Sequence, residues 1–289
     1  MDIKIPFIKY YELTEVMYEK STRTYHLRML NQLIDSLHFL NIKKLGDIDY
    51  SVGLKIIKYL KENTKNGNNS IQRHINYLRK IMRHYELYTT IENLERLKDD
   101  SIPFQRFYHD ELQLIIDYVK NMSHSKNSIV YSCFVILLLD SGVRVSEAIS
   151  IKIRNIDFEN QQIYLDNTKT KKMRYAPFSN FSLKYIKKLI KVNPNREYLF
   201  YNFIRNRTTN KSDIKLFYRR LKNTLGIDRI HTHRFRKTFG SLLVENGLPI
   251  EHLQSIWQHS RITTTMRYVQ YLETKSLKEY KKYNKWGIN

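Results

Sequence analysis

Two arginines, two histidines and a tyrosine stand in a fixed order along this chain, and these residue types suit chemistry on a phosphodiester. Arg144 follows a glycine–valine pair, and His233, Arg236, His259 and Tyr268 lie in the C-terminal part of the sequence. Bidentate guanidinium groups fit non-bridging phosphate oxygens better than an ammonium group does, and the charge stabilisation that they provide grows towards the transition state. With a tyrosine oxygen as nucleophile, such a set could attack a DNA phosphate without a metal ion.

The signal lies in the order of the set, because each residue alone is a weak indication. Arg144 comes after a glycine break and before the start of a helix, which places it at a tight corner. Arg236 lies three residues after His233, so the two share one face of a helix near its start. His259 and Tyr268 are separated by a short run of threonines.

These motifs together resemble those of the tyrosine recombinase family, which includes the phage integrases, Xer and Cre. The resemblance is carried by Gly142–Glu147, His233-x-x-Arg236, Gln258-His259-Ser260 and Tyr268. The motifs extend the resemblance over residues 105–275. The N-terminal region is similar to the family's helical core-binding domain but carries no diagnostic motif.

The resemblance implies a role for each residue. Arg144 and Arg236 would clamp the scissile phosphate, and His233 and His259 would donate further hydrogen bonds to it. Tyr268 would attack to give a 3′-phosphotyrosyl link. This link conserves the bond energy, so neither ATP, nor a metal, nor any other cofactor is expected.

The family's catalytic lysine corresponds to Lys169, which lies on the predicted turn of a β-hairpin and would protonate the departing 5′ hydroxyl. Lys171 and Lys172 are close competitors for this role. Glu147, one turn after Arg144, matches an acidic position that supports the active site of the family.

Two positions depart from the family's pattern. Lys237 stands where a second histidine is common, and it keeps a proton-bearing donor in place. Gln258 replaces the usual glycine before His259, which removes an easy backbone turn. The group that takes the proton of Tyr268 is open, with His233 as a candidate.

The bulk composition favours a nucleic-acid partner. The 289 residues include 50 Lys and Arg against 28 Asp and Glu, a formal net charge of +22, and such a field attracts polyanions. An anionic membrane surface is the competing partner, but the basic residues are spread along the chain and not clustered. No apolar run reaches the roughly 18 residues of a membrane span. The single cysteine, Cys133, is expected in a helix core and suits a reducing cytoplasm, the expected location.

The N-terminal third is predicted to be helical. Ser21 and Ser70 are expected to cap helices whose apolar positions run from Leu27 to Leu40 and from Ile71 to Tyr85, with another helix at Val52–Leu60 between them. The other face of the 71–85 helix carries only cationic and amide side chains, without an acidic partner: Gln72, Arg73, Asn76, Arg79, Lys80 and Arg83. A solvated surface is the plain alternative, but this inventory suits phosphates and base edges, and it predicts a helix that faces a DNA groove.

The C-terminal two-thirds begin after a predicted linker at 98–106, which contains Pro103. A helix opens at His109, an apolar helix ends at Asp140, and Gly142 then breaks the chain. Alternating patterns predict three short strands at 156–158, 163–165 and 173–178. Everything later is expected to be helical, at about 181–192, 213–225, 233–246, 250–258 and 263–283.

The expected fold class is therefore mainly α. Residues 1–97 would form a helical domain similar to the family's SAM-like core-binding domain, and residues 107–289 an α+β catalytic domain with a small antiparallel sheet and a helical tail. The resemblance implies a site-specific DNA recombinase of the simple two-domain type that acts through a Holliday junction. A mobile element is favoured, for integration, excision or transposon cointegrate resolution, because the composition is typical of an AT-rich genome. Xer-type chromosome-dimer resolution is the alternative.

Other function classes are open to test. A monomeric type IB topoisomerase uses similar chemistry, but the N-terminal helical domain and a dockable tail argue against it. A DNA-binding regulator with a dead active site would have lost Tyr268 or an arginine, and a metal-dependent transposase would need a carboxylate cluster. The expected partners are double-stranded DNA with a specific site and further copies of the chain, a dimer on each site and a synaptic tetramer. The tail 276–289 would either dock on a neighbouring copy or pack on its own domain.

Overall fold

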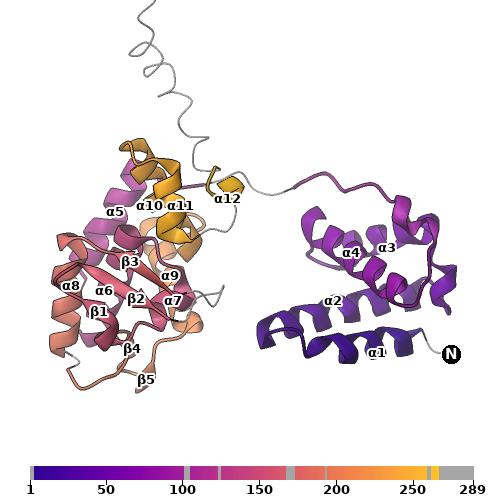
Figure 1. The fold of residues 1–289 in the computed structure, drawn as a ribbon, viewed down its shortest axis with the longest axis horizontal. Coiled ribbons are helices and arrows are strands. Elements are labelled where there is room, and N and C mark those ends of the chain that lie inside the picture. The colour runs from indigo at the N-terminus through magenta and orange to yellow at the C-terminus, as the bar shows by residue number, and fades with distance from the viewer. Residues whose placement is uncertain are drawn as a thin grey trace, which may run out of the picture. The chain divides into compact units, whose positions relative to one another are not determined.

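The computed structural model describes residues 3–100, 105–122, 125–166, 173–192, 194–258 and 262–266, without the side chains of Thr263 and Thr264. By its internal contacts the chain divides into two compact units, Met1–Pro103 and Phe104–Asn289. The fold is mainly helical with small antiparallel sheets (Figure 1), as the sequence predicts.

The first unit is helical. It contains α1 (Lys4–Glu15), α2 (Lys20–Phe39), α3 (Tyr50–Asn63) and α4 (Asn68–His84), with short 3-10 turns η1 (Leu45–Asp47) and η2 (Thr90–Asn93). The apolar stripes of the helices meet in one core, in which Leu33, Ile56, Ile71 and Leu78 are fully buried. Burial of these stripes is what stabilises helices of this length.

Both predicted serine caps are wrong. Glu19 stands at the N-cap of α2, which begins at Lys20, so Ser21 lies inside the first turn. Gly67 stands at the N-cap of α4, and Ser70 donates from its hydroxyl to the side-chain oxygen of Asn66. The sequence analysis also missed α1, whose side chains Phe7 and Tyr10 are buried in the core.

The second unit is built round the apolar helix α6. Its helices are α5 (His109–Lys120), α6 (Lys126–Ser141), α7 (Val145–Ile149), α8 (Asn180–Val192), α9 (Lys211–Leu225), α10 (Thr232–Glu245), α11 (Ile250–Trp257) and α12 (Ile262–Met266), with η3 at Ile153–Asn155. Helices α5, α8 and α10 pack on α6 (Figure 1). Cys133 lies on α6 and is buried, as expected for core packing, and this burial raises the pKa of its thiol.

Three strands form an antiparallel sheet in the order β1 (Ile156–Asp157), β2 (Gln162–Leu165) and β3 (Arg174–Pro177). In the register of β2 and β3, Ile163 pairs with Ala176 and both side chains are buried. The three predicted strands are thus confirmed. The prediction that only helices follow is wrong, because β4 (Tyr201–Asn202) and β5 (Arg207–Thr208) form a short hairpin before α9.

Across the described residues, no helix combines the length and the apolar character that crossing a membrane requires.

Candidate active site

Arg144 lies at the corner between α6 and α7. Gly142 ends α6 with a φ of 61°, a left-handed conformation that a glycine adopts without strain. Arg144 then occupies the N-cap position of α7, and its backbone N–H donates to Glu147 Oε2 at 2.7 Å. Its guanidinium Nη1 donates to Glu147 Oε1, also at 2.7 Å, while the side chain stays 29% exposed. The carboxylate thus fixes both ends of Arg144 and leaves part of the guanidinium accessible.

Glu147 is itself buried between two arginines. Arg174, at the start of β3, donates from Nη2 to Glu147 Oε2 at 2.6 Å, and neither side chain of this pair is more than 1% exposed. Burial alone would raise the pKa of the Glu147 carboxyl, but the charges and hydrogen bonds of Arg174 and Arg144 hold this pKa below its usual value. Glu147 is therefore ionised, and it bridges the corner to the sheet.

The first two turns of α10 carry His233 and Arg236. The Arg236 guanidinium is buried, and its Nη1 donates to the carbonyl oxygen of Gly142 at 2.5 Å. Its Cζ lies 4.0 Å from the ring centroid of Trp257, the last residue of α11, a cation–π arrangement. Arg236 is thus bonded to the corner that carries Arg144, although the two arginines lie 92 positions apart in the sequence.

Glycines make this packing possible. A Cβ on Gly240 would lie 2.3 Å from the Trp257 ring, and one on Gly142 would lie 2.5 Å from the ring of Phe239. Both distances are shorter than real contacts, so the indole can sit beneath Arg236 only because these two positions lack a side chain.

His233 is surrounded by cationic groups at the N-terminal end of α10. Although the side chain as a whole is exposed, desolvation of the ring by protein atoms, followed by the charges of Lys237 and Arg236, lowers the pKa of His233 to about 4. The imidazole is therefore neutral near pH 7. A neutral ring can accept a proton, so this position can hold either a hydrogen-bond donor or a base.

Gln258 shows how the chain turns without the expected glycine. Its backbone is left-handed, with a φ of 48°, and it caps the end of α11. The side-chain amide donates to the carbonyl oxygen of Met173 at 3.0 Å, next to the start of β3. The glutamine thus adopts the conformation that glycine favours, and its amide adds a bond that glycine could not make.

Three predicted residues, Lys169, His259 and Tyr268, lie outside the described residues, as do the competing Lys171 and Lys172. Arg144, His233 and Arg236 are described, together with Glu147 and Lys237.

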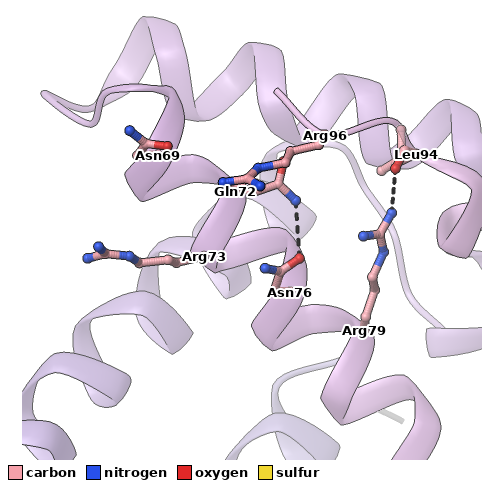
Figure 2. A pocket seen from close by; sticks show the side chains of 7 residues that line it. All are labelled: Asn69, Gln72, Arg73, Asn76, Arg79, Leu94 and Arg96. Carbon is pink, nitrogen blue, oxygen red and sulfur yellow. Dashed lines mark hydrogen bonds between the residues drawn. The ribbon is translucent and has the colours of Figure 1, made fainter. Parts of the chain in front are cut away.

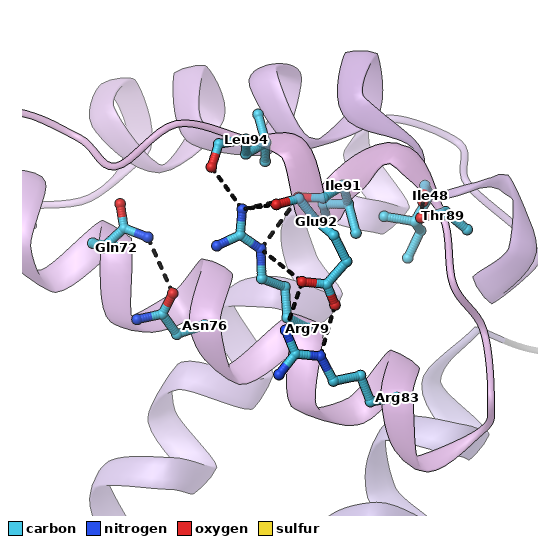
Figure 3. A network of polar contacts seen from close by, with 9 residues as sticks. All are labelled: Ile48, Gln72, Asn76, Arg79, Arg83, Thr89, Ile91, Glu92 and Leu94. Atoms are coloured by element: carbon cyan, nitrogen blue, oxygen red, sulfur yellow. Dashed lines mark hydrogen bonds and ion pairs between the residues drawn. The ribbon is translucent and has the colours of Figure 1, made fainter.

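The polar face of α4 differs from the prediction in one respect: it has an acidic partner. Glu92, in η2, pairs with Arg83 at 2.7 Å and with Arg79 at 3.7 Å (Figure 3). Arg79 also donates to the backbone carbonyl oxygens of Ile91, Glu92 and Leu94. Glu92 lies eight residues beyond the end of α4, and the chain turns back through η2 to bring its carboxylate beside Arg79 and Arg83, which the helical spacing of α4 alone does not predict.

The remaining part of this face lines a hollow of about 560 Å³ formed by Asn69, Gln72, Arg73, Asn76, Arg79, Leu94 and Arg96 (Figure 2). Gln72 donates to Asn76 at 3.1 Å and accepts from the backbone N–H of Leu97. Arg73, Asn76 and Lys80 are exposed. At the N-terminal end of α4, the carboxylate of Asp100 accepts the backbone N–H groups of Asn68 and Asn69.

Arg174 and Trp257 are the structural residues of the site that sequence reasoning missed. Arg174 follows the predicted hairpin turn directly, and an arginine in a strand that must be half-buried signals a buried ion pair. Trp257 is one of only two tryptophans, and it stands directly before the Gln258–His259 motif.

Known proteins resemble this chain in sequence and in fold. The model of the phage integrase family matches residues 105–275. The chain is 59% identical over 289 residues to a probable integrase/recombinase of Acholeplasma phage L2, covering 100% of both chains. It is 26% identical over 279 residues to the tyrosine recombinase XerC of Staphylococcus saprophyticus, covering 91% of this chain and 90% of the relative.

A solved structure of the Tn1549 transposon integrase in complex with circular intermediate DNA has the same fold. It superposes with a TM-score of 0.77 at 18% identity, and the match covers 93% of this chain and 95% of the integrase. The family match over more than half of the chain, together with the 59% identity to a full-length relative, settles the assignment: this chain belongs to the phage integrase family and is a tyrosine recombinase.

Proposed function

We propose that this recombinase cuts and rejoins double-stranded DNA at a specific site through a 3′-phosphotyrosyl intermediate on Tyr268. One observation supports this above all others: Arg236 is hydrogen-bonded to the Gly142 carbonyl of the corner that carries Arg144. The guanidinium of Arg236 is thus bonded to the backbone two residues before Arg144, and clamping of one phosphate requires such an approach of the two segments.

In the proposed reaction, the oxygen of Tyr268 attacks phosphorus while Arg144 and Arg236 bind the non-bridging oxygens. The P–O bond to tyrosine forms, and the bond to the 5′ oxygen breaks. Lys169 gives a proton to the leaving 5′ oxygen, and His233, which is neutral near pH 7, is the candidate acceptor for the phenol proton. Attack by a 5′ hydroxyl of another strand reverses these steps, so the chemistry needs no external energy source and no metal ion.

His259 donates a further hydrogen bond to the phosphate in this scheme, and Lys237 supplies an additional positive charge beside His233. Residues 107–289 form the catalytic domain, 98–106 the linker, and 1–97 the core-binding domain. Within the latter, the exposed side chains of Arg73, Asn76 and Lys80, with Gln72, face the DNA groove.

The name of the phage relative favours integration or excision of a mobile element. The likeness to XerC supports chromosome-dimer resolution as the second candidate. In both cases we propose a dimer on each site and a synaptic tetramer joined by the tail 276–289. A plasmid that carries the two junctions between the mobile element and its host DNA distinguishes these two functions. A recombinase of the element should recombine the two junctions with each other, whereas a chromosome-dimer resolvase should not.

Tyr268→Phe tests the covalent step. The variant should bind duplex DNA about as tightly as the wild type and form no covalent protein–DNA adduct, which denaturing gel electrophoresis detects. Tyr271→Phe, which alters the next tyrosine along the chain, is the matched control and should still form the adduct. An adduct on the Tyr268→Phe chain would reject the assignment of the nucleophile.

A further inference from the structure

Arg174 joins three segments of the catalytic unit. It lies at the start of β3, and its guanidinium is buried. Nη2 donates to the Glu147 carboxylate at 2.6 Å, and Nη1 donates to the carbonyl oxygen of Ile256 near the end of α11 at 3.0 Å. One planar side chain thus connects the strand, the buried carboxylate of α7 and the last turn of α11.

Each of these segments leads to a residue of the proposed active site. Glu147 holds the backbone and the guanidinium of Arg144. In the sequence, strand β3 begins five residues after Lys169, and Ile256 is three residues before His259. The bond from Gln258 to the Met173 carbonyl ties the same two segments a second time.

We propose that Arg174 is a positioning residue for DNA cleavage, which holds Arg144 in place through Glu147 and keeps the hairpin and the end of α11 in register with it. The inference rests on the proposed function, since it concerns the same site. Arg174 itself does not touch the DNA, because its side chain is only 1% exposed.

The charges round Glu147 explain why an arginine is needed. Arg144 approaches the carboxylate from its own corner and Arg174 from β3, while Arg236 of α10 reaches that corner at the Gly142 carbonyl. Arginine is planar, and its several N–H donors can serve a carboxylate and a carbonyl at the same time. Without Arg174, desolvation of the buried carboxyl is opposed by Arg144 alone, so Glu147 becomes easier to protonate. A protonated Glu147 no longer holds Arg144 with an ionic bond.

The test measures the rate of covalent adduct formation from pH 5.5 to 8.5, with the full-length chain and a nicked duplex on which the wild type forms the adduct. For Arg174→Met we expect a rate at least about tenfold lower near pH 7 and a rise with pH across this range, since buried carboxyl pKa values can rise by up to about 3–5 units. The rate of the wild type should not rise with pH across this range. The affinity of Arg174→Met for DNA should differ from that of the wild type by less than about threefold. The substitution removes a buried guanidinium group, which makes no contact with a phosphate. Glu147→Gln added to Arg174→Met should abolish the pH dependence.

Two controls separate positioning from stability. Arg207→Met removes an ion-pair partner of buried Asp213 at the start of α9, far along the chain from the corner, and should leave the pH profile unchanged. Arg174→Lys keeps the charge but cannot bond both partners equally well, so it should give an intermediate rate and a flat profile. If Arg174→Met does not fold, as circular dichroism would show, Arg174→Lys decides: a rate equal to that of the wild type overturns the inference.

A folded Arg174→Met chain with the wild-type rate and profile also overturns it. If the wild type forms the adduct and the substitutions of Arg174 have no effect, only the positioning role is rejected. If the wild type forms no adduct, the proposed function itself is rejected.

Discussion

At the scale of single residues, the site depends on how buried groups are paired. Arg236 rests on the Trp257 ring and donates to the Gly142 carbonyl, so a buried guanidinium has both a cation–π partner and an acceptor. The pKa of the neighbouring His233 is lowered first by desolvation of its ring and then by the positive charges of Lys237 and Arg236. Desolvation and the cluster of positive groups that suits a phosphate thus both keep this imidazole neutral.

Lys237→Met should raise the pKa of His233, since it removes the largest of the charges that lower it. The pKa should stay below the usual value of 6.5, because desolvation and the charge of Arg236 persist. Because the lowered pKa means that the folded state binds the proton less readily than the unfolded state, stability falls as the pH drops from about 6.5 towards 4. This loss should be smaller in the variant.

Titration of the His233 ring resonances by NMR measures this shift, with His233→Gln used to assign them. Lys215→Met, on the exposed face of α9, is a matched control that should leave the resonance unaffected. An identical titration curve for Lys237→Met and the wild type would contradict the prediction.

At the scale of elements, α4 combines two kinds of arginine on one face. Arg79 donates to the carbonyl oxygens of Ile91, Glu92 and Leu94 in and after η2, whereas Arg73 is exposed at the hollow. The Arg79 guanidinium satisfies acceptors of the backbone, and hydrogen bonds from a charged donor contribute more to stability than those from a neutral one. Identical residue types on one helix thus serve the fold in one turn and remain available to a ligand in another.

Arg79→Met should destabilise the N-terminal unit by about 2 kcal/mol, the typical cost of losing hydrogen bonds from a charged donor. Hydrogen exchange of the α4 amides in the full-length chain, followed by mass spectrometry, should then be roughly 30-fold faster, provided these amides exchange through opening of the unit. Arg73→Met should leave exchange unchanged and weaken DNA binding. Equal exchange in the two variants would remove the distinction between them.

At the scale of the whole molecule, charge dominates. The net charge of +22 on 289 residues is spread over both compact units. Carboxylates pair with some of these charges: Glu147 in the second unit and Glu92 in the first are each shared between two arginines. The field should therefore govern encounter with DNA, while a small set of bonded residues governs the chemistry.

The affinity for a random-sequence duplex should fall steeply with salt. With 6–10 phosphate contacts, the loss between 50 mM and 200 mM salt is about 10³–10⁵-fold, since each contact releases counterions. Fluorescence anisotropy at a series of salt concentrations gives the slope. Arg73→Met should make the slope less steep by about 1, and Arg207→Met, whose arginine is paired with Asp213, should change it less. A flat response in the wild type would count against binding through the phosphates.

Much of the local structure follows from sequence pattern. The three strands and the break at Gly142 were predictable because alternation, and a glycine after an apolar run, are local signals. The hairpin of β4 and β5 escaped because each strand is only two residues long. The serine caps failed because the N-cap residues are Glu19 and Gly67, two and three residues before the two serines.

The sequence by itself determined the family of the chain and the identity of its candidate catalytic residues, because ordered motifs carry that information without coordinates. Only the tertiary structure decided which groups meet. The bond from Arg236 to the Gly142 carbonyl and the pairing of Glu147 with Arg174 join segments that lie 94 and 27 residues apart in sequence. Such contacts depend on packing of the whole core, and no local spacing rule encodes them.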